Sequence, residues 1–324
     1  MNTRNSLIAK LRSVAIAVPM IGMQVSGVYA QAVIRTTSLS PTYPPGSPLG
    51  TWSGNSLVAL ESYSSGEPIL RIYDQSGAEI QRVAVQVPGS QLINILGNRF
   101  ARSTDGYVAV SGSAYGAGDR GAIFLAVISP DGASQLIVRT DPYIPHALVF
   151  ASDGTLWVAG NDRDERETAK EVSQDYFLVR RFDKKGRLLG GVVPRTLFPP
   201  RHSDFVTSSY LVSSKDRVGW FSPRANQYME FSLDGKALAT YQLSLRPDIV
   251  SGVALCDDNT LWVSVQAEDA RQQSTLTSLD RVRGVLSGGN RQPFIHLYGC
   301  SGTTLVATSA TSPARSAVDW IATR

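Results

Sequence analysis

Three histidines are the residues of this chain best suited to acid–base chemistry near neutral pH. They are His146, His202 and His296. Imidazole titrates close to neutral pH, so any of them could act as a general base or hold a polar ligand. His202 lies between Arg201 and Asp204, and an arginine in such a cluster can pair with a carboxylate or a phosphate. This chemistry requires a fold that brings the side chains to one place.

The common sequence signatures of other chemistries do not occur. The chain contains no Gly-x-Gly-x-x-Gly, no Walker loop, no Gly-x-Ser-x-Gly and no His-Glu-x-x-His. Nucleotide binding and the common hydrolase mechanisms therefore lack their local requirements.

The first 30 residues have the pattern of a secretory signal peptide. Arg4, Lys10 and Arg12 precede the uncharged, mostly apolar run 13–28, which ends in the small-residue cleavage pattern Val-Tyr-Ala30. Removing residues 1–30 leaves 28 basic and 27 acidic side chains, so we expect no nucleic-acid partner and no anionic membrane partner. No later stretch approaches the roughly 18 uncharged residues of a membrane span. We expect an extracytoplasmic protein, either periplasmic or secreted.

Residues 31–324 repeat one pattern six times and are predicted to form a single domain. In the clearest unit, two β-rich runs within 147–160 flank the hairpin signal Asp153-Gly154. Equivalent first turns lie near residues 54, 105, 153, 215, 258 and 302, at separations of 51, 48, 62, 43 and 44 residues. Second turns follow at 74–77, 131–132, 183–186, 234–235 and 280–284. Four strands in roughly 40 to 50 residues is the size of one β-propeller blade.

The two ends of the repeat array predict how the ring closes. The last unit lacks an outer strand after 317–322, whereas residues 32–39 belong to no unit of their own. We therefore expect 32–39 to complete the sixth sheet, which removes a free strand edge and favours a monomer. The predicted fold is all-β: a six-bladed β-propeller of four-stranded antiparallel blades, closed by an N-terminal strand that joins the last blade. Seven blades or an incomplete ring are the alternatives.

The segment 145–160, Pro-His-Ala-Leu-Val-Phe-Ala-Ser-Asp-Gly-Thr-Leu-Trp-Val-Ala-Gly, followed by Phe-Asp-Lys-Lys-Gly at 182–186, carries a family resemblance. It resembles the repeat of the six-bladed propellers grouped around the streptogramin lyases, the NHL repeat and the gluconolactonase-like enzymes. The match covers one blade well and 253–265 moderately. It implies a fold, and a fold does not by itself imply a function.

The resemblance implies a central channel lined by the innermost strands, with ligands at its mouth. The opening positions of those strands are Ser47, Asn98, His146, Ser208, Ser251 and Ile295, the last followed by His296. A ring of such polar groups could hold water, a metal or a polar ligand; alternatively, the residues begin strands at a wet rim and bond one another. The candidate ligand-binding residues are Asn98, His146, Arg201, His202, Asp204, Ser208, Ser251 and His296.

Two loops longer than the repeat requires could add recognition elements on the same face. One is the charged insertion 161–175, which could contain a short helix. The other is 194–205, which carries Phe198 and Phe205 beside Arg201. Simple connection and solvated charge are the plainer explanation of both loops.

Two classes of function remain open from the sequence. The first is a binding protein for an unknown polar small molecule, or for a protein partner across the loops, with no cofactor. The second is a metal-assisted lyase or lactonase. The resemblance carries the role of general base onto His146 alone and allows Asn98 as a ligand of a divalent metal. The aspartates of the Asp-Gly pairs are assigned to their turns and not to a metal.

Cys256 and Cys300 are the only cysteines, and they lie at equivalent places in the fifth and sixth units. In an oxidising compartment two cysteines favour one disulfide. The alternative is a pair of small buried thiols at equivalent core sites. There is no Cys-x-x-Cys pair, which argues against a redox centre or a structural zinc site.

Overall fold

A computed structural model of the chain describes twelve stretches separated by short gaps. They are 32–40, 50–61, 68–95, 99–117, 121–162, 176–198, 204–245, 250–266, 273–289, 291–293, 295–309 and 317–323. The predicted signal peptide, residues 1–30, lies outside them.

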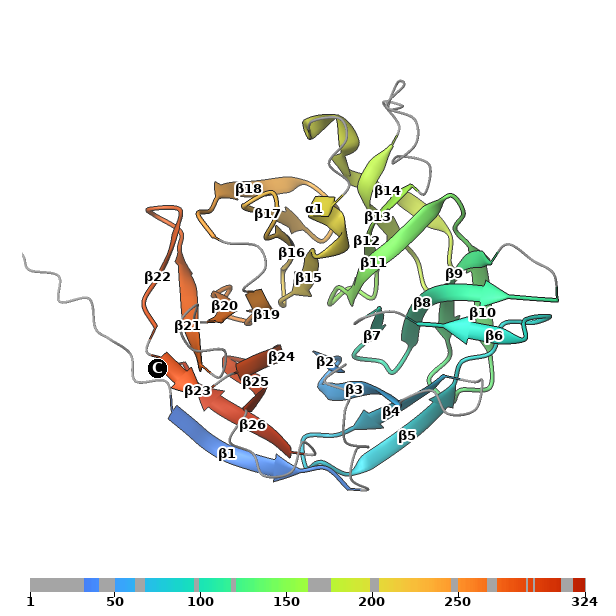
Figure 1. Cartoon of the computed structure of the whole chain (residues 1–324), viewed down its shortest axis with the longest axis horizontal. Coiled ribbons are helices and arrows are strands. Elements are labelled where there is room, and N and C mark those ends of the chain that lie inside the picture. Colours follow the sequence, from blue (N-terminus) through green and yellow to red (C-terminus); the bar gives the residue numbers. More distant parts are fainter. Residues whose placement is uncertain are drawn as a thin grey trace, which may run out of the picture.

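Six antiparallel sheets are arranged in a ring, so the predicted six-bladed β-propeller is confirmed (Figure 1). The innermost strands contact one another in a closed circuit, β2–β7–β11–β15–β19–β24 and back to β2. From inside outward, blade one has β2 (Gly50–Ser53), β3 (Ser56–Glu61), β4 (Ile69–Tyr73) and β5 (Glu79–Ala84). Blade three has β11 (Tyr143–Phe150), β12 (Leu156–Asp162), β13 (Phe177–Phe182) and β14 (Leu188–Pro194). Blade four has β15 (Tyr210–Ser213), β16 (Arg217–Ser222), β17 (Gln227–Ser232) and β18 (Ala237–Gln242).

Blades two and five each have a divided strand. In blade two, β6 (Leu92–Asn94) and β7 (Phe100–Arg102) both pair with β8 (Val108–Tyr115), followed by β9 (Ala122–Ile128) and β10 (Gln135–Arg139). In blade five, β19 (Val250–Leu255), β20 (Leu261–Gln266) and β21 (Gln273–Asp280) are followed by β22 (Val285–Ser287) and β23 (Arg291–Pro293), which both pair with β21. Helical structure among the described residues is limited to η2 (Arg195–Leu197) and α1 (Asp204–Thr207), and no described helix has the length and apolarity to cross a membrane.

Turn chemistry sets the register of each meander. At the hairpin between β11 and β12, Gly154 adopts φ 83°, a conformation that disfavours side chains with a Cβ. At the outer hairpin of the same blade, Asp183 accepts hydrogen bonds from the backbone N–H groups of Lys185 and Arg187, both at 2.9 Å. The carboxylate is thus used by the turn, as predicted.

The sixth blade is completed by the N-terminal strand, as predicted. β1 (Ala32–Ser38) pairs antiparallel with β26 (Ala317–Ala322), outside β25 (Thr304–Ser309) and β24 (Ile295–Ser301). Thr36 Oγ1 donates to Asp319 Oδ1 at 2.7 Å, and the indole N–H of Trp320 donates to Thr37 Oγ1 at 3.0 Å. The first and last described strands therefore share one sheet (Figure 1).

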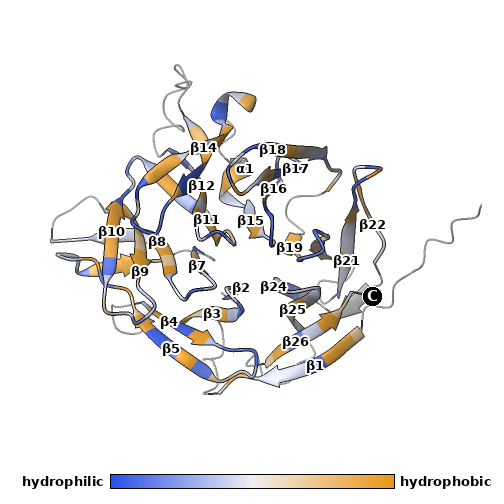
Figure 2. Ribbon diagram, turned by 180° about the vertical axis from the view of Figure 1, so that it is seen from behind, coloured by the Kyte–Doolittle hydropathy of each residue, from blue (hydrophilic) through white to orange (hydrophobic). Residues whose placement is uncertain are grey.

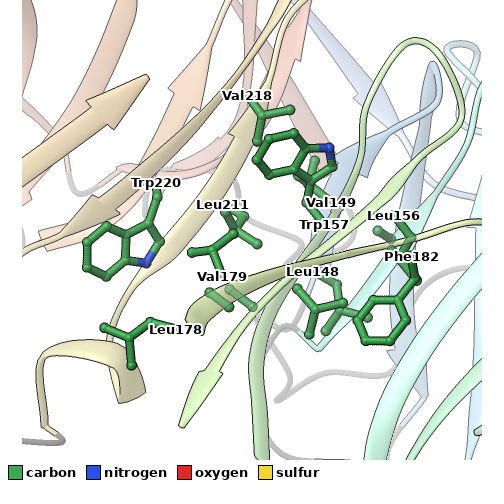
Figure 3. Packing of buried hydrophobic residues seen from close by; sticks show 14 of the residues in the cluster. Leu148, Val149, Leu156, Trp157, Leu178, Val179, Phe182, Leu211, Val218 and Trp220 are labelled. Atoms are coloured by element: carbon green, nitrogen blue, oxygen red, sulfur yellow. The ribbon is translucent and has the colours of Figure 1, made fainter. Parts of the chain in front are cut away.

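The core lies between blades, where sheet faces pack on one another. Trp157 and Trp220 are fully buried, and the Trp157 ring lies 5.9 Å from that of Phe231 in the next blade. Figure 3 shows Leu211 and Val218 of blade four beside Trp157 and Val149 of blade three. Apolar residues alternate with polar ones along many strands, whereas several connecting turns are hydrophilic (Figure 2). Trp157 therefore packs between blades three and four.

Candidate functional site

A pocket of about 560 Å³ occupies the axis of the propeller. Every one of the six blades contributes residues of its innermost strand or of that strand's ends. Its polar and charged lining residues include Arg99, Arg102, His146, Ser208, Lys215 and Asp257. Because all blades meet there, the pocket is the described feature best placed to combine side chains that lie far apart in the sequence.

His146 reaches this pocket through an irregularity in β11. The register between β11 and β12 shifts between Pro145 and Ala147, so His146 has no directly opposed partner. A bulge of this kind bends the strand and redirects a side chain. The half-buried imidazole of His146 lines the pocket.

Arg99, His146 and Asn161 form a hydrogen-bonded row at the pocket wall. Arg99 Nη2 lies 3.0 Å from His146 Nδ1, and His146 Nε2 lies 2.5 Å from Asn161 Oδ1. Arg99 directly precedes β7, and Asn161 is a buried residue of β12. Residues on or next to three strands of two blades thus fix the orientation of the His146 imidazole.

The donors in this row determine the tautomer of His146. A guanidinium can only donate hydrogen bonds, so Nδ1 must accept and carries no proton. Nε2 then carries the proton and donates to the Asn161 carbonyl oxygen. Protonating Nδ1 would break the bond to Arg99 and bring two cations into contact. The geometry therefore holds His146 as a neutral ring with both nitrogens in use.

Two arginines of the pocket wall are partly desolvated. Burial lowers the pKa of Arg99 and the pKa of Arg102 from the ordinary arginine value, because a less hydrated site disfavours the cation. Arg102 Nη1 donates to the Gly54 carbonyl at 3.3 Å and to Ser56 Oγ at 2.9 Å. Both of these acceptors are neutral.

Of the other predicted site residues, only Ser208 lines the pocket within the described stretches. Its hydroxyl is buried and has no hydrogen-bond partner among the described residues. Ser251 and His296 lie on β19 and β24 but are not lining residues. Ser251 Oγ donates to Ser264 Oγ at 2.8 Å, and the His296 ring packs edge-on against Tyr298 with centroids 5.4 Å apart.

Several predicted site residues lie outside the described residues. They are Ser47, Asn98, Arg201 and His202, as well as the side chain of Asp204, whose backbone begins α1. Most of the insertion 161–175 is outside them too. In the second long loop, the Phe198 ring packs edge-on against Trp220 at 5.6 Å, so it contributes to the core.

Arg99 and Asn161 were not among the residues singled out from the sequence. Arg99 follows the predicted opening position Asn98 by one residue, so the repeat register pointed to its neighbourhood. Asn161 lies on the second strand of its blade, and only the pairing of β11 with β12 brings it to His146. A search limited to inner-strand positions could not find it.

The described residues contain no group of three His, Cys, Asp or Glu side chains arranged to hold a metal ion. Asn98, which we considered as a metal ligand, lies outside them. His146 lines the pocket, and the buried Asn161 contacts it from β12.

The predicted disulfide is confirmed. Cys256 and Cys300 are joined, with their α-carbons 5.2 Å apart, and the bond links the inner-strand region of blade five to that of blade six. Cys300 is a lining residue of the pocket. The cross-link therefore stabilises the wall of the pocket as well as a contact between two blades.

No family model matches the sequence, and a search of curated proteins finds no match. Solved structures share the fold at low identity. A protein from Bacteroides fragilis NCTC 9343 is 14% identical, with a TM-score of 0.51 over 88% of this chain and 85% of that chain. Virginiamycin B lyase from Staphylococcus aureus is 8% identical, with a TM-score of 0.44 over 90% of this chain and 99% of that chain. The solved structures that match thus include a streptogramin lyase, a member of the group named for the segment 145–160.

Proposed function

We propose that this protein binds a polar small molecule in the axial pocket, outside the cytoplasm. The observation that carries the proposal is the row Arg99–His146–Asn161 on the wall of a 560 Å³ pocket. Concave sites at which a few polar groups converge are typical of small-molecule sites. The signal pattern of residues 1–30 and the Cys256–Cys300 bond support an extracytoplasmic location.

The same row favours binding over general-base catalysis by His146. A general base needs a free lone pair directed at the substrate proton. The only lone pair of the Nε2–H tautomer is at Nδ1, and Arg99 donates to it. His146 therefore supports the position of Arg99. A metal-assisted lyase or lactonase is the second candidate, because the segment 145–160 that contains His146 resembles the repeat of such enzymes.

Binding can be tested with a panel of sugars, amino acids, sugar acids and lactones, using ligand-observed NMR and thermal shift. We expect at least one compound to bind saturably at one molecule per chain. His146→Phe keeps a planar ring but removes both hydrogen-bonding nitrogens, so we expect it to weaken that binding about tenfold or more. His296→Phe is the matched control, because His296 is not a lining residue.

The same panel separates the two candidate functions. Each compound is followed for consumption, and the purified protein is analysed for divalent metal. Turnover that disappears in His146→Ala, together with one metal ion per chain, would establish the metal-assisted enzyme and not the binding protein. The absence of saturable binding by every compound class, or equal loss in both phenylalanine variants, contradicts a ligand site at His146.

A further inference from the structure

Positive charge is concentrated on the wall of the axial pocket. The charged lining residues are Arg99, Arg102, Lys215 and Asp257, three basic and one acidic. Residues 31–324, by contrast, carry 28 basic and 27 acidic side chains. A local excess of one sign in a walled cavity focuses the electrostatic field toward ligands of the opposite sign.

Within the described residues, Arg99 has no carboxylate partner, and the same is true of Arg102. Arg71 and Arg217 show the opposite arrangement. Arg71 Nη2 lies 2.7 Å from Glu61 Oε1, and Arg217 Nη1 lies 3.1 Å from Glu230 Oε2. The described contact of the Arg99 side chain is the neutral ring of His146. A desolvated cation without a counter-charge is costly to fold, and an anionic ligand would relieve that cost.

The guanidinium of Arg99 is held ready for such a ligand. It has five N–H donors, and the contact with His146 engages one nitrogen, Nη2. Arg99 is a lining residue of the pocket, so its other donors lie where a ligand can reach them. His146 is in turn fixed by Asn161, and an oriented guanidinium loses little freedom when it binds a planar or tetrahedral oxyanion.

Ser208 supplies a second group without a partner. Its hydroxyl lines the same pocket, is buried, and makes no hydrogen bond within the described stretches. A buried polar atom of this kind costs free energy unless a bound molecule satisfies it. A hydroxyl can donate to an oxyanion or accept from a ligand hydroxyl.

We infer that the ligand is an anion, and that Arg99 binds its carboxylate or phosphate group. This inference rests on the proposed function and specifies the charge of the ligand. The Arg99 fork contacts the oxyanion directly, His146 and Asn161 position that fork, and Ser208 lies on the same pocket wall. No bond is made or broken in the ligand.

The test uses acetate, inorganic phosphate and glycerol as probes of the two anionic groups and of a neutral polyol. The ring nitrogen shifts of His146 are followed by NMR in the full-length mature protein. We expect a saturable shift with acetate or phosphate, and the probe that binds more tightly identifies the class of acidic group. Glycerol is expected to give no saturable shift at the same concentrations.

Arg99→Met removes the charge and keeps an apolar stem of similar reach. This substitution should weaken binding of the anion about tenfold or more, because a charge-assisted hydrogen bond is lost. Arg99→Lys keeps the charge but not the fork and should retain part of the affinity. Arg187→Met is the matched control. The Arg187 side chain is 78% exposed, and its replacement changes the net charge by the same amount.

Two results would overturn the inference: no saturable shift with either anion, or unchanged anion affinity in both Arg99 variants. If Arg99→Met does not fold, Arg99→Lys alone decides, because unchanged affinity there means that the fork is not used. A neutral compound from the panel that binds at His146 while both anions fail would remove the anion inference and leave the proposed function intact.

Discussion

Single residues of this protein show two ways of handling buried charge. Glu230 is 1% exposed and lies beside two arginines, Arg217 of its own blade and Arg281 of the next. Arg99 lies beside a neutral imidazole. The first arrangement is complete without a ligand, and truncating one member would leave uncompensated charge. The second is complete only when something anionic enters the pocket, which is why we assign it to function.

His296 provides a prediction at the same scale. Burial lowers the pKa of His296 below its ordinary value, and its Nε2 has no partner among the described residues. The unfolded chain therefore binds a proton more readily than the folded one. From about pH 6.5 downward, the free energy of unfolding should fall as pH falls. His296→Gln cannot titrate, so its loss of stability over that range should be smaller.

Urea unfolding of the wild type and of His296→Gln at about pH 7.5 and about pH 5.5 checks this. The carboxylates are common to both proteins, so the comparison isolates the histidine. An equal loss of stability in the two proteins would mean that His296 is not held neutral by burial.

Elements of the fold place the site through their irregularities. The bulge at His146 and the break between β6 and β7 both lie at the pocket end of inner strands. Regular pairing would direct alternate side chains into the spaces between blades. Departures from regular pairing turn His146 and Arg99 toward one another. The site therefore depends on where the pairing of the strands is interrupted.

The disulfide links two of these elements and gives a prediction about stability. Cys256 and Cys300 are 44 residues apart, and the loop-closure model gives about 4 kcal/mol for a loop of that length. Cys256→Ala combined with Cys300→Ala should lower the free energy of unfolding by roughly 2 to 4 kcal/mol. Denaturant unfolding measures this free energy. Reducing agent should destabilise the wild type and leave the double variant unchanged. The same stability in all samples would contradict the prediction.

The whole molecule is closed by the pairing of β1 with β26. Without β1, the edge of β26 and the ring of Trp320, over which Arg35 lies at 4.0 Å, would lose their cover. An exposed strand edge promotes association between chains.

A chain that begins at residue 41 should therefore unfold more easily and self-associate, compared with one that begins at residue 31. Sedimentation velocity and thermal unfolding report both effects. Thr36→Val is a milder variant: it removes the donor to Asp319, which is 4% exposed, and should cost about 1 to 3 kcal/mol while leaving the chain monomeric. A monomeric residue-41 chain as stable as the longer one would show that closure does not depend on β1.

The sequence by itself determined the blades and how they close. First turns recur at a spacing of 43 to 62 residues, and turns of the blades use local contacts, as Asp183 illustrates at the outer hairpin of blade three. Hairpin pairing and the shared sheet of residues 32–38 and 317–322 follow from local signals and from counting strands. The equivalent positions of the two cysteines in neighbouring repeats allowed a disulfide or two buried thiols, and the structure decided for the disulfide.

Only the tertiary structure decided what meets at the axis. His146 was recognisable as a candidate, but its partners Arg99 and Asn161 come from a neighbouring blade and from a second strand. Ser251 shares the predicted register with His146, and His296 follows the next register position, yet neither lines the pocket. The physical reason is that a repeat fixes where strands begin, whereas bulges and blade-to-blade packing fix where side chains point. Neither of these leaves a local pattern in the sequence.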